Sequence, residues 1–141
     1  MEALKISMSG LDVEWQRLQV IAQNLANINS TRNEAGDVYR PQRLLSGPDV
    51  NFSQLMKSDD GSAKATGVRV MGIENTPNGV RLAFEPNHPH ADANGMVSYP
   101  DVDHAAEMTL MIKSSRVYEA NLTAISIAQQ MYNRALDMGR G

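Results

Sequence analysis

The chain has 141 residues, enough for one ordinary domain or for a small domain with long extensions, and this length excludes most multidomain enzymes. Its 13 Lys and Arg residues against 16 Asp and Glu residues give a net charge of −3 with both signs scattered, which disfavours nucleic acid as a partner. Aromatic residues make up 5% and cysteine is absent, so the composition excludes a core built on aromatic rings, disulfides and thiolate chemistry.

Apolar residues near the start of the chain recur in alternating steps of three and four, the a/d pattern of a coiled-coil helix. This stripe consists of Leu4, Met8, Leu11, Trp15, Leu18, Ala22 and Leu25. Short polar residues from Asn27 onward compete with helical hydrogen bonds, so we expect the helix to end near Ile28. Because Glu2 and Lys5 interrupt the first ten residues, we expect neither a cleaved secretory signal nor direct membrane insertion.

The middle of the chain, from about residue 32 to residue 100, holds all six prolines and seven of the ten glycines. This composition predicts short strands joined by turns. Two alternating segments, 67–74 and 79–85, flank the turn-forming sequence Asn-Thr-Pro-Asn and predict a β-hairpin. The stretch 46–66 has no sustained period, and we expect a mobile loop there.

A second long helix is predicted after Pro100, because Asp101 or Asp103 can cap its start and no Gly or Pro follows before Gly139. Its a/d track consists of Met108, Met111, Ser115, Tyr118, Leu122, Ile125, Gln129, Tyr132 and Leu136. The predicted fold is mainly α with a small β part: two long terminal coiled-coil-type helices flank a short hairpin-containing middle segment. The segments are an N-terminal assembly helix (1–31), a middle loop and hairpin (32–100) and a C-terminal assembly helix (101–141).

Each helix also carries a second apolar line that a single helix pairing would leave in water. The two lines are Ile6, Val13 and Val20 on the first helix, and Leu110, Val117, Ala124, Met131 and Met138 on the second. The middle segment has few large residues, so we interpret both lines as contacts with other protein chains. A closed antiparallel pair of helices, with one stray apolar line on each, is the alternative.

Three parts of the chain resemble sequences of one known family. They are Gln-Asn-Leu-Ala-Asn-Ile-Asn at 23–29, the Pro/His/Asn-rich segment 86–102, and Ser-Arg-Val-Tyr-Glu-Ala-Asn at 115–121. The first and third are similar to the terminal signatures of flagellar basal-body rod proteins, within the axial rod and hook superfamily. The second resembles the proximal-rod type, as does the lack of a Thr-Pro-Gly-Tyr turn after the Asn-Leu-Ala-Asn box.

The resemblance implies a structural subunit of the proximal rod, the drive shaft that crosses the periplasm and transmits torque from motor to hook. It also implies helical assembly with itself and other rod proteins, and export without a cleaved signal by the flagellar type III export apparatus. The assembly residues expected are Leu4, Met8, Leu11, Trp15, Leu18, Leu25, Asn24, Asn27, Met108, Met111, Tyr118, Asn121, Leu122, Ile125, Tyr132 and Leu136. Asn24 and Asn121 belong to this set because Asn is unfavourable inside helices and its amide can bridge chains, whereas helix-end chemistry is an equal alternative for Asn27.

The remaining polar residues support other interpretations less well. A soluble coiled-coil adaptor or secretion-linked regulator would use the same heptads for one discrete partner. His88, His90 and Asp92 offer ligands for zinc, but their spacing matches no zinc motif, and a hydrogen-bonded loop is the simpler interpretation. Arg116 and Glu119 are expected to form an ion pair on the helix surface. With no catalytic constellation or cofactor motif in the sequence, we expect no enzyme activity and no cofactor.

Overall fold

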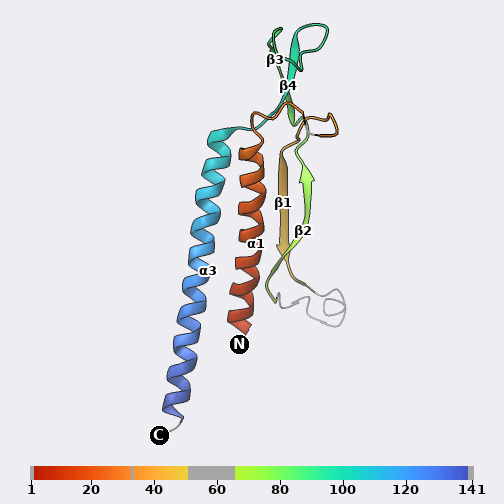
Figure 1. Cartoon of the computed structure of the whole chain (residues 1–141). Helices are drawn as coiled ribbons and strands as arrows, with labels where there is room; N and C mark the ends of the chain where they lie inside the picture. The colour runs from red at the N-terminus through yellow and green to blue at the C-terminus, as the bar shows by residue number, and fades with distance from the viewer. Residues whose placement is uncertain (1, 33, 51–65, 140–141) are drawn as a thin grey trace. The chain divides into compact units, whose positions relative to one another are not determined.

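The computed structural model describes residues 2–32, 34–50 and 66–139. Within these ranges it contains two long helices and two pairs of strands, arranged as in Figure 1. The elements in chain order are α1 (Glu2–Ala26), β1 (Gln42–Pro48), β2 (Val68–Asn75), β3 (Val80–Phe84), β4 (Met96–Pro100) and α3 (His104–Met138). The predicted fold class, two long terminal helices with a small β part between them, is confirmed. No helix in the described ranges is both long and apolar enough to span a membrane.

The helix ends follow local side-chain chemistry. At the start of α3, the carboxylate of Asp103 accepts a hydrogen bond from the amide of Ala106 at 3.1 Å, as predicted for a cap. This helix ends one residue before Gly139, also as predicted. At the end of α1, the Asn27 side-chain amide donates to the carbonyl of Gln23 at 2.8 Å. Asn27 therefore takes part in helix-end chemistry, one of the two roles considered for it.

The strands pair differently from the predicted hairpin. β1 pairs with β2, and β3 pairs antiparallel with β4, so the predicted pairing of 67–74 with 79–85 is wrong. On one side of the turn, the amide of Thr76 donates to Pro41 O at 2.7 Å, and on the other, the amide of Asp101 donates to Gly79 O at 2.9 Å. The Asn-Thr-Pro-Asn turn thus connects two hairpins. Residues 46–48 of the predicted loop belong to β1, and residues 51–65 lie outside the described residues.

Contacts along the chain define two compact units, and each contains part of both helices. The first unit consists of Met1–Gln16, Leu45–Gly72 and Lys113–Gly141, and the second consists of Arg17–Leu44 and Ile73–Ile112. These units cut across the three segments defined from sequence order, so the three-part division stays a prediction.

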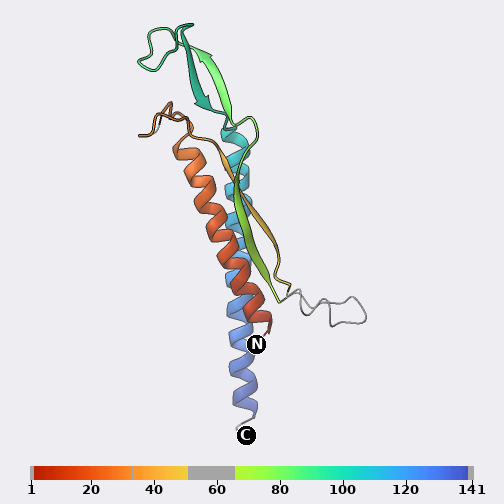
Figure 2. The ribbon, with the colours of Figure 1, turned by 90° about the vertical axis from the view of Figure 1, so that its right-hand side faces the viewer.

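In the first unit, one face of α1 is covered by the strand pair. Ser9 of α1 accepts a hydrogen bond from the amide of Val68 in β2 at 3.1 Å, and Val13, one turn further along, is only 3% exposed. Figure 2 shows β1 and β2 running alongside α1. In the second unit, Val20 and Ile21 of α1 and Leu44 of β1 are likewise buried.

These contacts correct the interpretation of the second apolar line on α1. Ile6, Val13 and Val20 were expected to need another chain, but Val13 and Val20 are buried within the chain, and only Ile6 stays exposed, at 44%. Two strands laid along a helix can bury an aliphatic line with few large side chains, because strand backbone atoms also make van der Waals contacts. The corresponding line on α3 stays exposed, from Leu110 to Met138.

Candidate assembly surface

In the first unit, α1 and α3 lie close together at Gly10. A Cβ placed on Gly10 would lie 2.9 Å from Nδ2 of Asn121, so the bare backbone of α1 makes room for the Asn121 side chain. One turn away, the rings of Trp15 and Tyr118 lie with centroids 6.3 Å apart and planes tilted by 43°. The two helices therefore form a direct seam, and Asn121, predicted to bridge chains, contacts its own chain there.

Because of this close approach, we expect Gly10→Ala to destabilise the wild-type chain but to stabilise a chain that lacks the Asn121 side chain. Alanine favours a helix by about 1 kcal/mol over glycine, but the added methyl group would displace Asn121, and such overpacking costs about 1–3 kcal/mol. We expect a net loss of about 1 kcal/mol in the wild-type background and a net gain of about 1 kcal/mol when Asn121→Ala removes the clash. Urea denaturation of the four chains measures both effects. Equal effects in the two backgrounds would contradict the contact.

Two shallow hollows lie along this seam. One, of ≈ 320 Å³, is lined by Ala3, Leu4, Ala128, Gln129, Tyr132 and Asn133. The other, of ≈ 300 Å³, is lined by Leu11, Asp12, Trp15 and Tyr118. Residues of the two predicted a/d tracks line both hollows, which shows that the tracks of α1 and α3 meet on one side of the helix pair in the first unit.

Most predicted assembly residues are accessible on this surface or in the second unit. Those exposing between 39% and 54% of their area are Met8, Trp15, Met108, Leu122, Tyr132 and Leu136. Those of intermediate exposure are Leu4, Leu11, Leu18, Leu25, Asn27, Met111, Tyr118, Asn121 and Ile125. We name the first-unit part of this set, with its two hollows, the seam surface. A half-exposed apolar track of this kind is available to a further helix.

Asn24 is the exception, and its predicted contact with another chain is not supported. Its side chain is 1% exposed. Its amide donates to Gln42 O at 2.9 Å, and its carbonyl oxygen accepts from the Gln42 amide at 2.9 Å and from the Tyr39 hydroxyl at 2.8 Å. Asn24 therefore fixes the start of β1 against α1 within the second unit.

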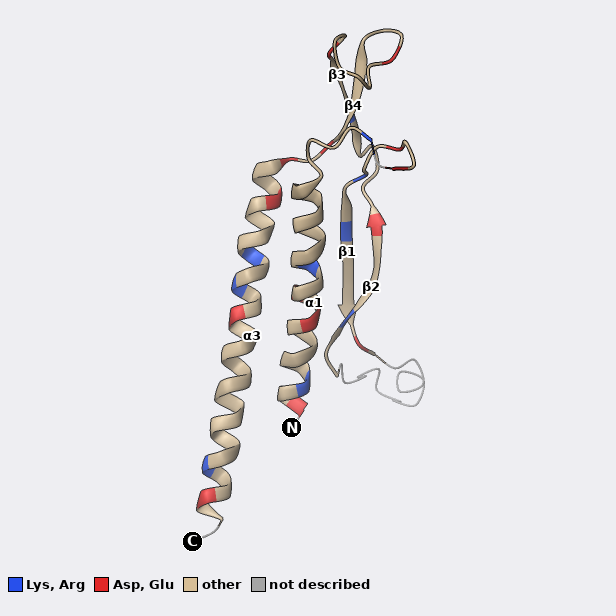
Figure 3. Ribbon diagram, in the orientation of Figure 1, with Lys and Arg blue, Asp and Glu red and all other residues tan. Residues whose placement is uncertain are grey.

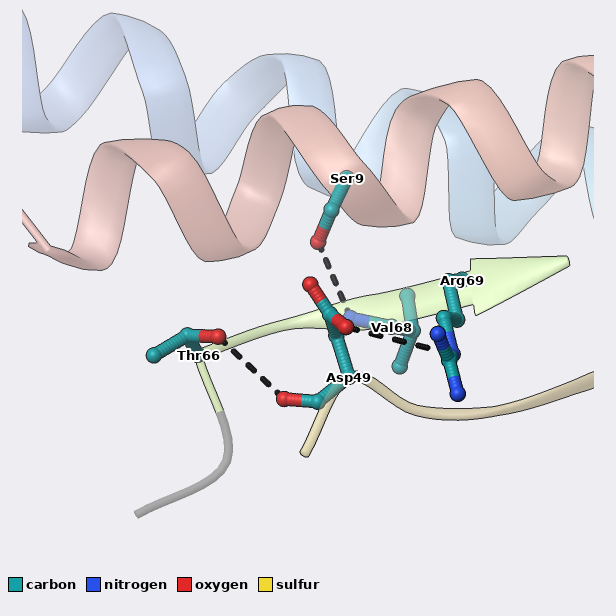
Figure 4. Close-up of polar contacts among 5 residues, drawn as sticks. All are labelled: Ser9, Asp49, Thr66, Val68 and Arg69. Atoms are coloured by element: carbon teal, nitrogen blue, oxygen red, sulfur yellow. Dashed lines mark hydrogen bonds and ion pairs between the residues drawn. The ribbon is translucent and has the colours of Figure 1, made fainter. Parts of the chain in front are cut away.

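Polar contacts also attach the strand pair to α1 in the first unit (Figure 4). Ser9 donates to Ile6 O at 2.7 Å while it accepts from the amide of Val68, so its hydroxyl bridges the helix and β2. Below it, the Thr66 hydroxyl donates to Asp49 O at 3.2 Å, and the Asp49 carboxylate lies 3.9 Å from Arg69 Nε. The ion pair is more than half exposed, so it contributes little. The Ser9 bridge is the contact that sets β2 along the helix.

The histidine loop is built from hydrogen bonds within the second unit. His90 Nδ1 lies 2.7 Å from the Thr31 hydroxyl, and the backbone amide of His90 donates to His88 Nδ1 at 3.0 Å. The carboxylate of Asp92 accepts from the amides of Asn94 and Met96, each at 2.8 Å. Among the described residues, no group of three or more His, Asp and Glu side chains is arranged to hold a metal ion. The geometry fits a hydrogen-bonded loop.

Tyr39 has a raised pKa and provides a test of the second unit. Burial raises the pKa of its phenol above 10.0, and the nearby charge of Glu107 raises it further. Glu107 itself is buried, and its Oε2 has no hydrogen-bond partner among the described residues.

We expect phenolate absorbance to show Tyr39 titrating above pH 10.0, and Glu107→Gln to lower this pKa. Because the pKa is raised on folding, the associated stability is complete below the unfolded pKa and is lost as the pH rises through the folded pKa. The difference between the wild-type and Tyr39→Phe titrations isolates this residue. An unchanged pKa of Tyr39 in Glu107→Gln would contradict the charge contact.

Comparison with known proteins identifies the family. A family model described as the C-terminal part of flagellar basal body rod FlgEFG proteins matches residues 93–138. The chain is 34% identical to the flagellar basal-body rod protein FlgC of Borreliella burgdorferi, over 99% of this chain and 97% of the relative. It is 34% identical to FlgC of Bacillus subtilis, over 98% and 97%, and 32% identical to FlgC of Salmonella typhimurium, over 96% and 94%. This chain belongs to the FlgC family of flagellar basal-body rod proteins.

The range matched by the rod-protein family model covers β4 and α3, and the structure divides the motif at 115–121 between two sides of α3. Tyr118 and Asn121 contact α1, while Arg116, Val117 and Glu119 are exposed. Within the described ranges Arg116 has no carboxylate at ion-pair distance, so the expected pair with Glu119 is not formed. Figure 3 shows charges of both signs in the first part of α3 and again near its end, and the stretch 120–133 between them is uncharged.

The sequence patterns missed two exposed apolar residues of α3, Ile112 and Ile127. Ile127 is 52% exposed and lies three residues after Ala124 and four before Met131, on the second apolar line. The three-and-four spacing would have identified it, but that line was followed only in steps of seven.

Proposed function

We propose that this chain is a structural subunit of the proximal flagellar basal-body rod and that it polymerises through its two terminal helices. The observation that carries the proposal is the seam surface, where two long helices present half-exposed, mainly apolar residues of their a/d tracks. Surfaces of this extent on soluble chains usually mark an interface. The FlgC relatives, matched along nearly their whole length, are named as rod proteins, which supports the rod as the assembly in which this interface forms.

The partners proposed are copies of this chain and other rod proteins in a helical tube. A helix pair can pass tension and torsion along its own hydrogen-bonded backbone, and packing against neighbouring helices prevents it from bending. In this assembly the seam surface accepts helices from adjacent subunits. The second apolar line of α3, with Met131 and Met138 among its most exposed residues, gives a second contact on the same subunit.

The proposed location is the part of the basal body that crosses the periplasm, reached through the flagellar type III export apparatus without removal of a signal. The absence of cysteine supports this route, because a chain that passes unfolded into an oxidising compartment forms no wrong disulfides. In this role the chain transmits torque and catalyses no reaction.

An adaptor built on the same helices is not supported by the comparisons, and assembly type separates it from a rod subunit. An adaptor forms a closed complex of fixed stoichiometry, whereas a rod subunit repeats a heterologous contact in an open helical array.

Deleting the gene from its native host is expected to abolish swimming and leave basal bodies without a complete rod. A plasmid copy is expected to restore both. Electron cryomicroscopy of purified basal bodies would then show α1 and α3 as paired densities in the rod wall. Normal rods and normal swimming in the deletion strain would contradict the proposal.

A further inference from the structure

The second of the two hollows on the seam surface combines two aromatic rings with a carboxylate, which the first hollow does not. It is lined by Leu11, Asp12, Trp15 and Tyr118, and the rings of Trp15 and Tyr118 lie with their centroids 6.3 Å apart. Trp15 is the only tryptophan of the chain, and 53% of it is exposed. A large ring left half in water beside a second ring is typical of an anchor point in an interface.

Two aromatic faces and a carboxylate together recognise a cation. The negative faces of the rings attract a positive group, and the carboxylate supplies a charged acceptor at the same place. Asp12 Oδ2 accepts from the Gln16 side chain at 3.0 Å, and Oδ1 accepts no hydrogen bond within the described part of the chain. A planar guanidinium suits this arrangement better than an ammonium, because it can stack on a ring while its edge donates to the carboxylate.

The chain itself carries a cation placed to fill the hollow of a neighbour. Arg116 is exposed and unpaired within the described ranges. It is two residues from Tyr118 on α3, so it lies about 160° around the helix and only about 3 Å along its axis from that residue. Its side chain therefore cannot reach the hollow of its own chain, yet it sits at nearly the same level on the opposite side of the helix.

We propose that Arg116 of one copy of this chain inserts between Asp12, Trp15 and Tyr118 of the next copy. Donor and acceptor lie on opposite sides of α3, so the contact is heterologous and repeats from copy to copy without a two-fold axis, as an open array requires. The proposal rests on the proposed function, because it names the neighbour and the anchor of the same surface. Apolar packing alone does not select one register between two helices, and the arginine contact sets the register of the neighbouring helix.

Charge exchange tests the pair. We expect Asp12→Arg and Arg116→Asp each to impair swimming, and the chain carrying both changes to swim nearly as well as wild type, since every interface then regains one acid and one base. The matched control combines Asp12→Arg with Arg134→Asp, because Arg134 is another exposed arginine of α3. We expect no rescue in this control. Normal swimming of either single variant, or equal rescue by the control, would overturn the proposal.

Cross-linking identifies the neighbour directly, and the cysteine-free chain makes it specific. A disulfide requires that the two Cα atoms lie within roughly 7 Å of each other. An inserted arginine side chain holds the two backbones further apart than this, so a short bismaleimide is used as the cross-linker. Purified basal bodies carrying Asp12→Cys with Arg116→Cys are expected to give a ladder of linked copies on a denaturing gel, and Asp12→Cys with Arg134→Cys is expected to give none.

The outcomes separate this proposal from the proposed function. Absence of the wild-type chain from basal bodies would refute the rod assignment itself. A double-cysteine chain that is incorporated but stays monomeric, or that links to a different rod protein, would refute only the pairing between copies. If the cysteine variants fail to be incorporated, the charge exchange decides.

Replacing Asp12 with asparagine removes the charge but keeps the shape of the side chain. We expect Asp12→Asn to weaken the contact roughly three- to thirtyfold, measured as the concentration of the chain needed for assembly onto isolated rods.

Discussion

Swimming is expected to be lost when Leu122 is replaced by aspartate, although the isolated chain keeps its stability. Leu122 is 46% exposed on the α3 track, so the change costs the free chain no more than about 1 kcal/mol. At a packed seam, the same change removes about 1.5–3 kcal/mol of apolar burial and places an unpaired carboxylate out of water, which costs several kcal/mol more. Since about 1.4 kcal/mol corresponds to a factor of ten, association should weaken by more than roughly a thousandfold.

Two measurements separate assembly from folding in this variant. Urea denaturation is expected to give nearly the same midpoint as wild type, while soft-agar swimming is lost and the chain is missing from purified basal bodies. Gln130→Glu adds the same charge to an exposed polar position of α3 with almost no change in shape, and it is expected to swim normally. A strain that carried Leu122→Asp and swam at the wild-type rate would show that the α3 track is not an assembly surface.

The helices could be predicted because their signal is local. Steps of three and four between apolar residues, a capping Asp103, and a run without Gly or Pro up to Gly139 each act within one or two helical turns. In the structure α1 ends at Ala26, two residues before the predicted end at Ile28, and the side chain of Asn27 donates a hydrogen bond back to Gln23 O. The period also places Trp15 and Leu122 on the a/d tracks of their helices, although it does not say that they are accessible.

The strand pairing could not be predicted because its cause lies far away in the sequence. The segments before and after the Asn-Thr-Pro-Asn turn have the alternation of a hairpin, but each strand finds a partner elsewhere, β1 for one and β4 for the other. A turn sequence determines a local bend in the chain, but it does not determine which strand pairs with each of the flanking segments. The same pairing explains why the line of Val13 and Val20 needs no second chain: the hairpin of β1 and β2 returns to cover it.

Asn24 shows most clearly where sequence reasoning reached its limit. An asparagine inside a helix was identified as anomalous and was assigned to a contact with another chain, but the pattern gives no direction to its partner, which lies in β1 of its own chain. A usable signal was its place on the helix: Asn24 lies four residues after Val20 and so shares the face that turns out to be covered by the strands. A polar residue at the end of a buried apolar line indicates a backbone partner within the fold.

Replacing Asn24 with leucine is therefore expected to destabilise the second unit strongly. Leucine matches the side chain in size but leaves the amide and carbonyl of Gln42 and the hydroxyl of Tyr39 without their partners. An unsatisfied polar group at a partly buried site costs about 1–3 kcal/mol, and part of this cost is recovered where water reaches Gln42, so we expect a loss of about 3 kcal/mol.

Urea denaturation followed by circular dichroism measures this loss, and hydrogen exchange of the Gln42 amide localises it. The matched control is Asn29→Leu, an exposed asparagine just beyond α1, with an expected change below about 0.5 kcal/mol. Asn24→Asp distinguishes the hydrogen bonds from simple packing: it keeps the acceptor for the Gln42 amide and Tyr39 but loses the donor to Gln42 O and buries a charge. We therefore expect Asn24→Asp to be less stable at neutral pH than near pH 3, relative to wild type, because a protonated carboxyl group can donate to the carbonyl of Gln42 while the carboxylate cannot. Unchanged stability in Asn24→Leu, with normal protection of the Gln42 amide, would mean that apolar packing alone holds β1 on the helix.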